Sequence, residues 1–148
     1  RIEKRLRSFV EKYRNMKEIK LVQEFHEKFE QYIGKSPSIP SKDIIALRNR
    51  LMVEELNEVL EEAILPTKDK NIEIKKLSKE LGDFFYVWAG TVVSYGLQDI
   101  MPEIIQEIHN SNMSKLGSDG KPVKREDGKV LKSELYKEAN LDRFFEKS

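Results

Sequence analysis

The fold is decided by two acidic and apolar stretches, residues 51–63, which read LMVEELNEVLEEA, and residues 79–95, which read KELGDFFYVWAGTVVSY. Both have the periodicity of an α-helix, in which side chains return to one face every three or four residues. An apolar stripe through Ile44, Leu47 and Leu51 continues, at about 100° per residue, into the glutamates of the first stretch. Those on the stripe are Glu55, Glu58 and Glu62, with Glu54 and Glu61 at its edge. The carboxylates therefore extend a face that is expected to point inward.

The second stretch places two more acids on a helix that is otherwise almost entirely apolar. Glu80 and Asp83 are three residues apart and share a face, and the run from Leu81 to Val93 predicts a central helix that is buried on most sides. A buried carboxylate needs a cation, which a lysine or a metal ion can supply. Oxygen-only clusters suit hard divalent ions, so this pattern favours Mg²⁺, with Mn²⁺ as a substitute, over a salt-bridged surface face.

The whole chain is expected to be all-α, with four main helices that form a bundle. Ser41 is a good N-cap, Pro102 fits a first helical turn, and Gly96 suits the position after a helix end. Two Asp-Gly pairs in residues 117–132 predict a small hairpin-like appendage. The expected helices are 1–33, with a break near residue 15, 41–65, 72–95, 99–115 and a short one near 141–145.

Composition narrows the function classes. The 148 residues contain 27 Lys and Arg against 26 Asp and Glu, a net charge of +1, which argues against binding to nucleic acid by bulk charge. Cysteine is absent, which excludes disulfides and thiolate metal sites, and no apolar run approaches the roughly 18 residues of a membrane span. We expect a cytoplasmic protein, although the chain begins at Arg1 and an upstream targeting segment stays open. Three segments are expected: a basic extension 1–20, a helical core 21–116 and a tail 117–148.

A second set of candidate residues includes two in the last turns of the fourth expected helix, residues 99–115. Its apolar stripe continues into Asn112 and Lys115, which suggests contacts to a sugar or phosphate, although capping of the helix end explains them equally well. His26 is either a core histidine or a substrate contact, and Tyr86 either touches substrate or packs. The lysines of residues 121–132, Lys129 among them, either close over phosphates or decorate a solvated appendage.

The paired acidic motifs resemble a known family. Glu54-Glu55-Leu56-Asn57-Glu58 followed by Glu80-Leu81-Gly82-Asp83 is similar to the EExxE…ExxD signature of the all-α nucleoside triphosphate pyrophosphohydrolases. The MazG-like, phosphoribosyl-ATP-pyrophosphohydrolase-like branch is resembled over about residues 25–132 by four segments: Phe25-His26, residues 83–86, residues 109–115 and Asp127-Gly128-Lys129.

The resemblance implies a role for each matching residue. Glu55, Glu58, Glu80 and Asp83 would hold Mg²⁺, and Glu54 would join a second ion or help to activate water. Asn112 and Lys115 would touch sugar or phosphate. Tyr86 and His26 are nucleoside contacts in this interpretation, and Lys129 belongs to the segment over the phosphates.

We therefore expect Mg²⁺-dependent hydrolysis of a (deoxy)nucleoside triphosphate between its α- and β-phosphates, in nucleotide-pool house-cleaning. The resemblance suggests dUTP or dCTP as substrate and a homodimer or dimer of dimers, with neither nucleic acid nor membrane as partner. Two alternatives stay open: a phosphoribosyl-ATP pyrophosphohydrolase, and a non-catalytic helical interaction module that uses its acids for salt bridges or structural ions.

Overall fold

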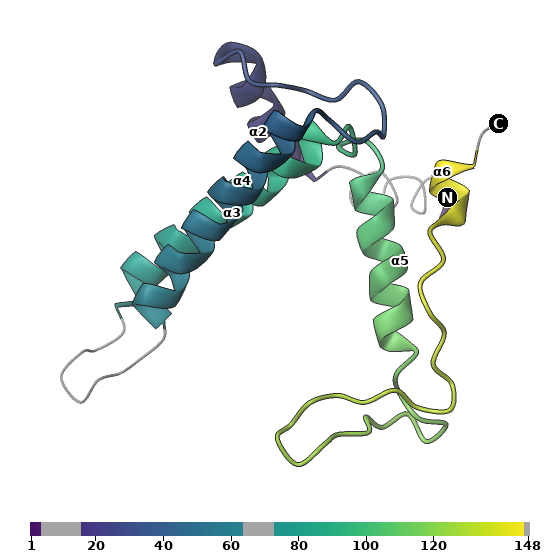
Figure 1. Cartoon of the computed structure of the whole chain (residues 1–148). Helices are drawn as coiled ribbons and strands as arrows, with labels where there is room; N and C mark the ends of the chain where they lie inside the picture. Colours follow the sequence, from purple (N-terminus) through teal and green to yellow (C-terminus); the bar gives the residue numbers. More distant parts are fainter. Residues whose placement is uncertain (4–15, 64–72, 147–148) are drawn as a thin grey trace. The chain divides into compact units, whose positions relative to one another are not determined.

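The computed structural model describes residues 1–3, 16–63 and 73–146, and these form an all-α protein (Figure 1). The predicted all-α class is confirmed, and within the described ranges the only β-structure consists of isolated bridges. Completion of the bundle by oligomerisation stays a prediction. No described helix is long and apolar enough to cross a membrane. The helices are α2 (Lys17–Lys28), α3 (Lys42–Ala63), α4 (Ile74–Ser94), α5 (Met101–Met113) and α6 (Asp142–Phe145).

The chain forms two compact units, which are treated separately below. One consists of the described residues of Asn15–Asp99 and the other of those of Arg1–Arg14 and Ile100–Ser148. The predicted basic helix over residues 1–20 lies largely outside the described residues. The predicted boundaries at residues 20 and 116 stay predictions.

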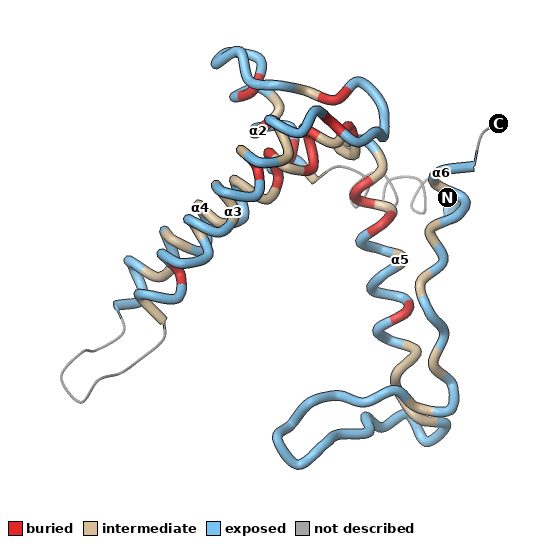
Figure 2. The backbone as a smooth tube through the Cα atoms, viewed as in Figure 1, coloured by how far each residue is buried: buried red, intermediate tan, exposed pale blue. Residues whose placement is uncertain are grey.

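In the first unit, α3 and α4 lie side by side, and α2 packs on α4 (Figure 1). The α3–α4 pair is antiparallel, since Arg48 contacts Thr91 whereas Glu55, further along α3, lies beside Asp83, earlier in α4. Burial concentrates where α2 meets the end of α4 (Figure 2). The most buried residues there include Ile19, Val22, His26, Ala89, Val92, Val93 and Ser94.

The prediction that α4 is buried on most sides is wrong for its first half. Leu81 is 49% exposed and Phe85 36% exposed, whereas Ala89 and Val93 are inaccessible. The described contacts of α2 and the loop after it fall on the second half of α4, from Tyr86 onward. The first half of α4 packs beside α3, and this one neighbouring helix covers only part of its apolar surface.

The first helical region ends at Lys28, not near Ile33 as its apolar stripe predicts. Glu30 has a φ of +53°, which reverses the chain. The backbone then bonds to the end of α4 instead of continuing the helix: Gly34 N–H donates to the Val93 carbonyl at 2.9 Å and Ser38 N–H to the Tyr95 carbonyl at 3.1 Å. Tertiary hydrogen bonds to α4 therefore replace the helical ones.

The end of α4 confirms the predicted role of Gly96. Tyr95 is the C-cap, and Gly96 follows it with a φ of +69°. Gly96 N–H donates to the Val93 carbonyl at 3.1 Å and Leu97 N–H to the Val92 carbonyl at 3.0 Å. This pair of bonds is a Schellman motif, which satisfies carbonyls that the helix end leaves free.

In the second unit, residues after α5 return along that helix. Antiparallel bridges join Leu116 to Pro122 and Lys124 to Val130, so the hairpin-like appendage is present, with its turn at Gly128. Residues 133–140 are held to α5 by side chains: Ser111 Oγ donates to the Lys137 carbonyl at 2.8 Å, and Asn140 N–H donates to Glu107 Oε1 at 3.1 Å. The short predicted terminal helix is α6.

Candidate active site

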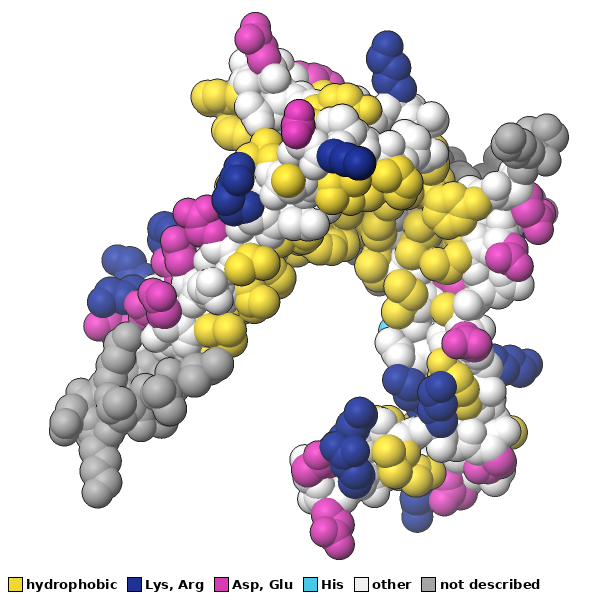
Figure 3. Space-filling model, in the orientation of Figure 1, with side chains coloured by type: hydrophobic (Ala, Val, Ile, Leu, Met, Phe, Trp, Pro, Cys, Tyr) yellow, Lys and Arg dark blue, Asp and Glu magenta, His cyan; other side chains and the backbone are white. Residues whose placement is uncertain are grey.

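Three of the predicted acids come together between α3 and α4. Glu55 of α3 and Glu80 and Asp83 of α4 are all partly buried, and each offers a carboxylate oxygen within 4.8 Å of the others. Acidic and basic side chains gather along this helix pair (Figure 3). The antiparallel arrangement explains the meeting, because the inward stripe of α3 runs past the face of α4 that carries Glu80 and Asp83. We call Glu55, Glu58, Glu80 and Asp83 the acidic cluster.

Negative charge in the acidic cluster exceeds the positive charge supplied by described residues. Lys79 Nζ lies 2.6 Å from Asp83 Oδ2 and 3.5 Å from Glu80 Oε1, but this lysine is 68% exposed. The Oε2 atoms of Glu55 and Glu80 are buried and have no hydrogen-bond partner among the described residues. Unsatisfied buried carboxylate oxygens are costly unless a cation meets them.

The crowding of carboxylates alters their protonation. Burial, followed by the charges of Asp83, Glu54 and Glu80, raises the pKa of Glu55 above its ordinary value. The pKa of Glu58 is raised first of all by a hydrogen bond shared with Glu80, and then by the charge of Glu55. Glu54 is itself exposed at the rim of the cluster. A divalent cation would offset the repulsion between these carboxylates, which otherwise favours their protonation. A donor set made only of oxygen atoms fits Mg²⁺ or Mn²⁺.

This crowding predicts the stability of a Glu55→Gln variant. The pKa of Glu55 is raised in the folded state, so its ionisation destabilises that state. The destabilisation is complete at a pH above the raised pKa and absent at a pH below the ordinary value of 4.5. In EDTA we therefore expect Glu55→Gln to melt above wild type at pH 7.5, with the gap closing as the pH falls toward 4.5. Adding Mg²⁺ at pH 7.5 should raise the melting temperature of wild type more than that of the variant. Thermal melts by circular dichroism test both; a variant less stable than wild type in EDTA at pH 7.5 contradicts the prediction.

A pocket of about 370 Å³ lies one helical turn from the acidic cluster. Two lining residues, Leu51 and Val87, stand four positions from Glu55 and Asp83 on the same helices. Two predicted nucleoside contacts, His26 and Tyr86, line this pocket. The residues of the pocket that matter here are Phe25, His26, Arg48, Leu51, Tyr86 and Val87.

Arg48 is a pocket residue that the sequence reasoning missed. It is only 6% exposed, and burial lowers the pKa of its guanidinium. Its Nη2 donates to the Val87 carbonyl at 2.6 Å and its Nε to Thr91 Oγ1 at 3.2 Å. The sequence did contain an indication: Arg48 follows Leu47 at the border of the apolar stripe of α3, so its side chain is expected to be buried.

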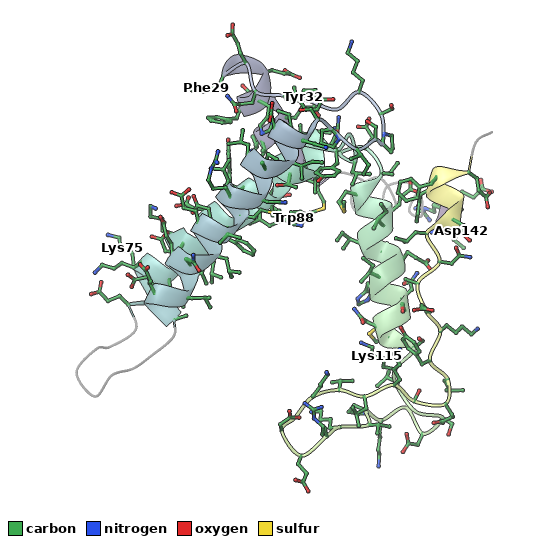
Figure 4. All side chains as sticks on the ribbon, in the orientation of Figure 1. Phe29, Tyr32, Lys75, Trp88, Lys115 and Asp142 are labelled. Atoms are coloured by element: carbon green, nitrogen blue, oxygen red, sulfur yellow. The ribbon has the colours of Figure 1, made fainter. Side chains whose placement is uncertain are left out.

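His26 is buried and held in one orientation. Its Nδ1 lies 2.9 Å from the Tyr32 carbonyl, which can only accept, so Nδ1 carries the hydrogen and Nε2 is left as an acceptor in the neutral ring. Burial lowers the pKa of His26, and the charge of Arg48 adds to that effect. Tyr32 lies in the loop after α2 (Figure 4), so the turn that ends α2 early also fixes this imidazole.

The other predicted substrate contacts belong to the second unit. Asn112 is exposed near the end of α5, and Lys115 Nζ donates to its Oδ1 at 2.9 Å (Figure 4). Lys129 is exposed in the hairpin-like appendage, where its backbone N–H donates to Asp127 Oδ1 at 3.1 Å. Their roles toward a substrate stay predictions.

An all-α helix pair with facing carboxylates fits the class of MazG-like nucleoside triphosphate pyrophosphohydrolases, and the family comparison shows that class. The family model of phosphoribosyl-ATP pyrophosphohydrolase (PRA-PH) matches residues 22–112, and the chain belongs to this family within that class. The matched span holds the acidic cluster and the pocket. No individual curated protein matches the chain. Family membership implies a pyrophosphohydrolase.

Proposed function

We propose that this chain hydrolyses the α–β phosphoanhydride bond of a 5′-triphosphate and releases pyrophosphate. The observation that supports it best is the acidic cluster, whose buried oxygens Glu55 Oε2 and Glu80 Oε2 lack partners among the described residues. Glu55, Glu58, Glu80 and Asp83 would hold Mg²⁺. When bound, such an ion neutralises triphosphate charge and lowers the pKa of a coordinated water.

The side chains of the protein would contribute to catalysis by their position and charge. The carboxylates of the acidic cluster would hold the ion that positions the triphosphate, and Glu54 or Glu55 would accept the proton of the attacking water. Water adds to one phosphorus of the α–β anhydride, the bond from that phosphorus to the bridging oxygen breaks, and monophosphate and pyrophosphate separate. Positioning and electrostatics carry most of the rate in phosphoryl transfer, which suits a site of acids held on two helices.

Two substrate classes share this chemistry. A (deoxy)nucleoside triphosphate such as dUTP or dCTP is the first, with a role in nucleotide-pool house-cleaning. Phosphoribosyl-ATP is the second, and the family match favours it at least as strongly. Apolar side chains left exposed on α3 and α4, Leu56, Leu81 and Phe85 among them, support the further proposal that a second copy packs there, in a homodimer or dimer of dimers.

A product assay tests the proposed reaction. The protein is incubated with Mg²⁺ and each of the deoxynucleoside triphosphates, dUTP and phosphoribosyl-ATP, and pyrophosphate and orthophosphate are measured separately. We expect one pyrophosphate per substrate consumed and full loss of turnover in EDTA, with the substrate profile choosing between the two classes. Orthophosphate as the only phosphate released would contradict α–β cleavage. No turnover of any substrate, with no effect of Mg²⁺ on the melting temperature, would favour a non-catalytic module.

A further inference from the structure

The pocket beside the acidic cluster holds a buried positive charge that no described carboxylate pairs. Arg48 is only 6% exposed, and its hydrogen bonds go to a carbonyl and a hydroxyl. A guanidinium has five N–H donors and no acceptor, so several donors stay available for a pocket ligand. Burying a cation without an anion is unfavourable, and a ligand that brings a strong acceptor would offset part of that cost.

The walls of the same pocket are apolar and aromatic. The rings of Phe25 and Tyr86 meet edge to face at 5.7 Å between centroids, and Leu51 and Val87 add aliphatic surface. Phe25 is 37% and Tyr86 39% exposed, so ring surface is left for a ligand. A flat aromatic group with oxygen acceptors at its edge matches these walls and the guanidinium together.

The local backbone of α4 is shaped to admit Arg48 and His26. A Cβ on Gly90 would lie 2.4 Å from Arg48 Nη2 and 2.9 Å from His26 Nε2, so any side chain at this position would collide with both groups. The result is a donor, Arg48, beside an acceptor, the unprotonated Nε2 of His26. An oxo group next to a ring N–H, as in uracil, thymine or guanine, presents the complementary pair.

We propose that this pocket binds the nucleobase of the substrate and that Arg48 donates to an oxo oxygen of that base, which makes Arg48 a specificity-determining residue. The inference rests on the proposed function for the class of ligand: the acidic cluster that would hold the triphosphate lies one turn along both helices, so the pocket adjoins the site proposed for the phosphates. Adenine has no oxo oxygen and therefore depends least on this residue.

Base-resolved binding tests the inference. Calorimetry in EDTA measures the affinity of the full chain for dUMP, dTMP, dCMP, dGMP and dAMP, for wild type, Arg48→Met and the matched control Arg50→Met, an exposed arginine on the same helix. We expect Arg48→Met to lose about 10- to 100-fold in affinity for the four oxo bases, the range of a hydrogen bond to a charged group, and clearly less for adenine. Arg50→Met should keep the wild-type profile.

Gly90→Ala gives an independent route if Arg48→Met does not fold. Its methyl group meets the flexible end of the Arg48 side chain, which can move, and the edge of the His26 ring, which Tyr32 holds in place. Alanine favours the helix, so we expect a folded variant, checked by circular dichroism, in which the guanidinium is displaced. The same selective loss for oxo bases is expected. An equal loss for all five nucleotides, or no loss, in a folded variant would overturn the inference.

The outcomes separate this inference from the proposed function. If wild type releases pyrophosphate and Arg48→Met binds the five monophosphates with the wild-type pattern of affinities, the hydrolysis proposal stands and the role of Arg48 is refuted. Arg48-dependent discrimination among monophosphates without any triphosphate turnover supports the nucleobase pocket and removes the hydrolysis proposal.

Discussion

Glu80→Gln and Asp83→Asn should each reduce Mg²⁺-dependent pyrophosphate release by about 100-fold or more, since even outer partners of a metal site cost about 10- to 100-fold when removed. Both side chains supply oxygens to the acidic cluster, and Glu80 Oε2 is buried without a described partner. The amide variants keep the shape of the side chain but lose its charge, so metal affinity and turnover should fall together. Steady-state rates at several Mg²⁺ concentrations measure the effect.

The matched control is Glu73→Gln, on the exposed N-cap residue of α4. Among the described residues, the Glu73 side chain pairs with Lys76 at 3.3 Å on the surface, and the two side chains are 61% and 59% exposed. Surface pairs of this kind contribute about 0–1 kcal/mol, so Glu73→Gln should behave as wild type. Near-normal rates in both Glu80→Gln and Asp83→Asn, with circular dichroism unchanged, would refute the metal role of the cluster.

Gly34→Ala should be among the most destabilising single-methyl substitutions in the first unit. A Cβ on Gly34 would lie 2.4 Å from Gly96 N and 2.8 Å from Gly96 Cα, and both are backbone atoms that cannot move aside cheaply. The added methyl also disturbs the hydrogen bond from Gly34 N–H to the Val93 carbonyl. We expect a loss of unfolding free energy near the upper end of the roughly 1–3 kcal/mol typical of overpacking, measured by urea denaturation.

Gly82→Ala is the control for that prediction. Gly82 is inside α4, and a Cβ there meets nothing within 4 Å. Alanine should stabilise this position by about 0.5–1 kcal/mol, because glycine loses more backbone entropy in a helix. Equal stability of the two variants would show that the close approach of Gly34 to Gly96 does not persist in solution. The consequence for the site is direct, since the same turn presents the Tyr32 carbonyl to His26.

Much of the candidate site could be predicted because it depends on local spacing. Glu80 and Asp83 share a helix face at i and i+3, and Glu55 continues an inward stripe of α3, so carboxylates were expected between two helices. The end of α4 at Gly96 was likewise predictable from a glycine that tolerates positive φ. The early end of α2 was not, because it results from hydrogen bonds to α4, a helix about 60 residues later in the chain.

The sequence by itself determined helices α3, α4 and α5, the acids on their inward faces and the family that the acidic motifs indicate, because side-chain periodicity and motif spacing are local properties. Only the tertiary structure decided the register of α3 against α4, which sets Glu55 beside Asp83 and buries Arg48 against Val87 and Thr91. It also decided that apolar side chains such as Leu81, toward the first half of α4, stay partly exposed in this chain. Burial and pairing depend on which distant segment packs alongside, and residue spacing within one helix does not encode that.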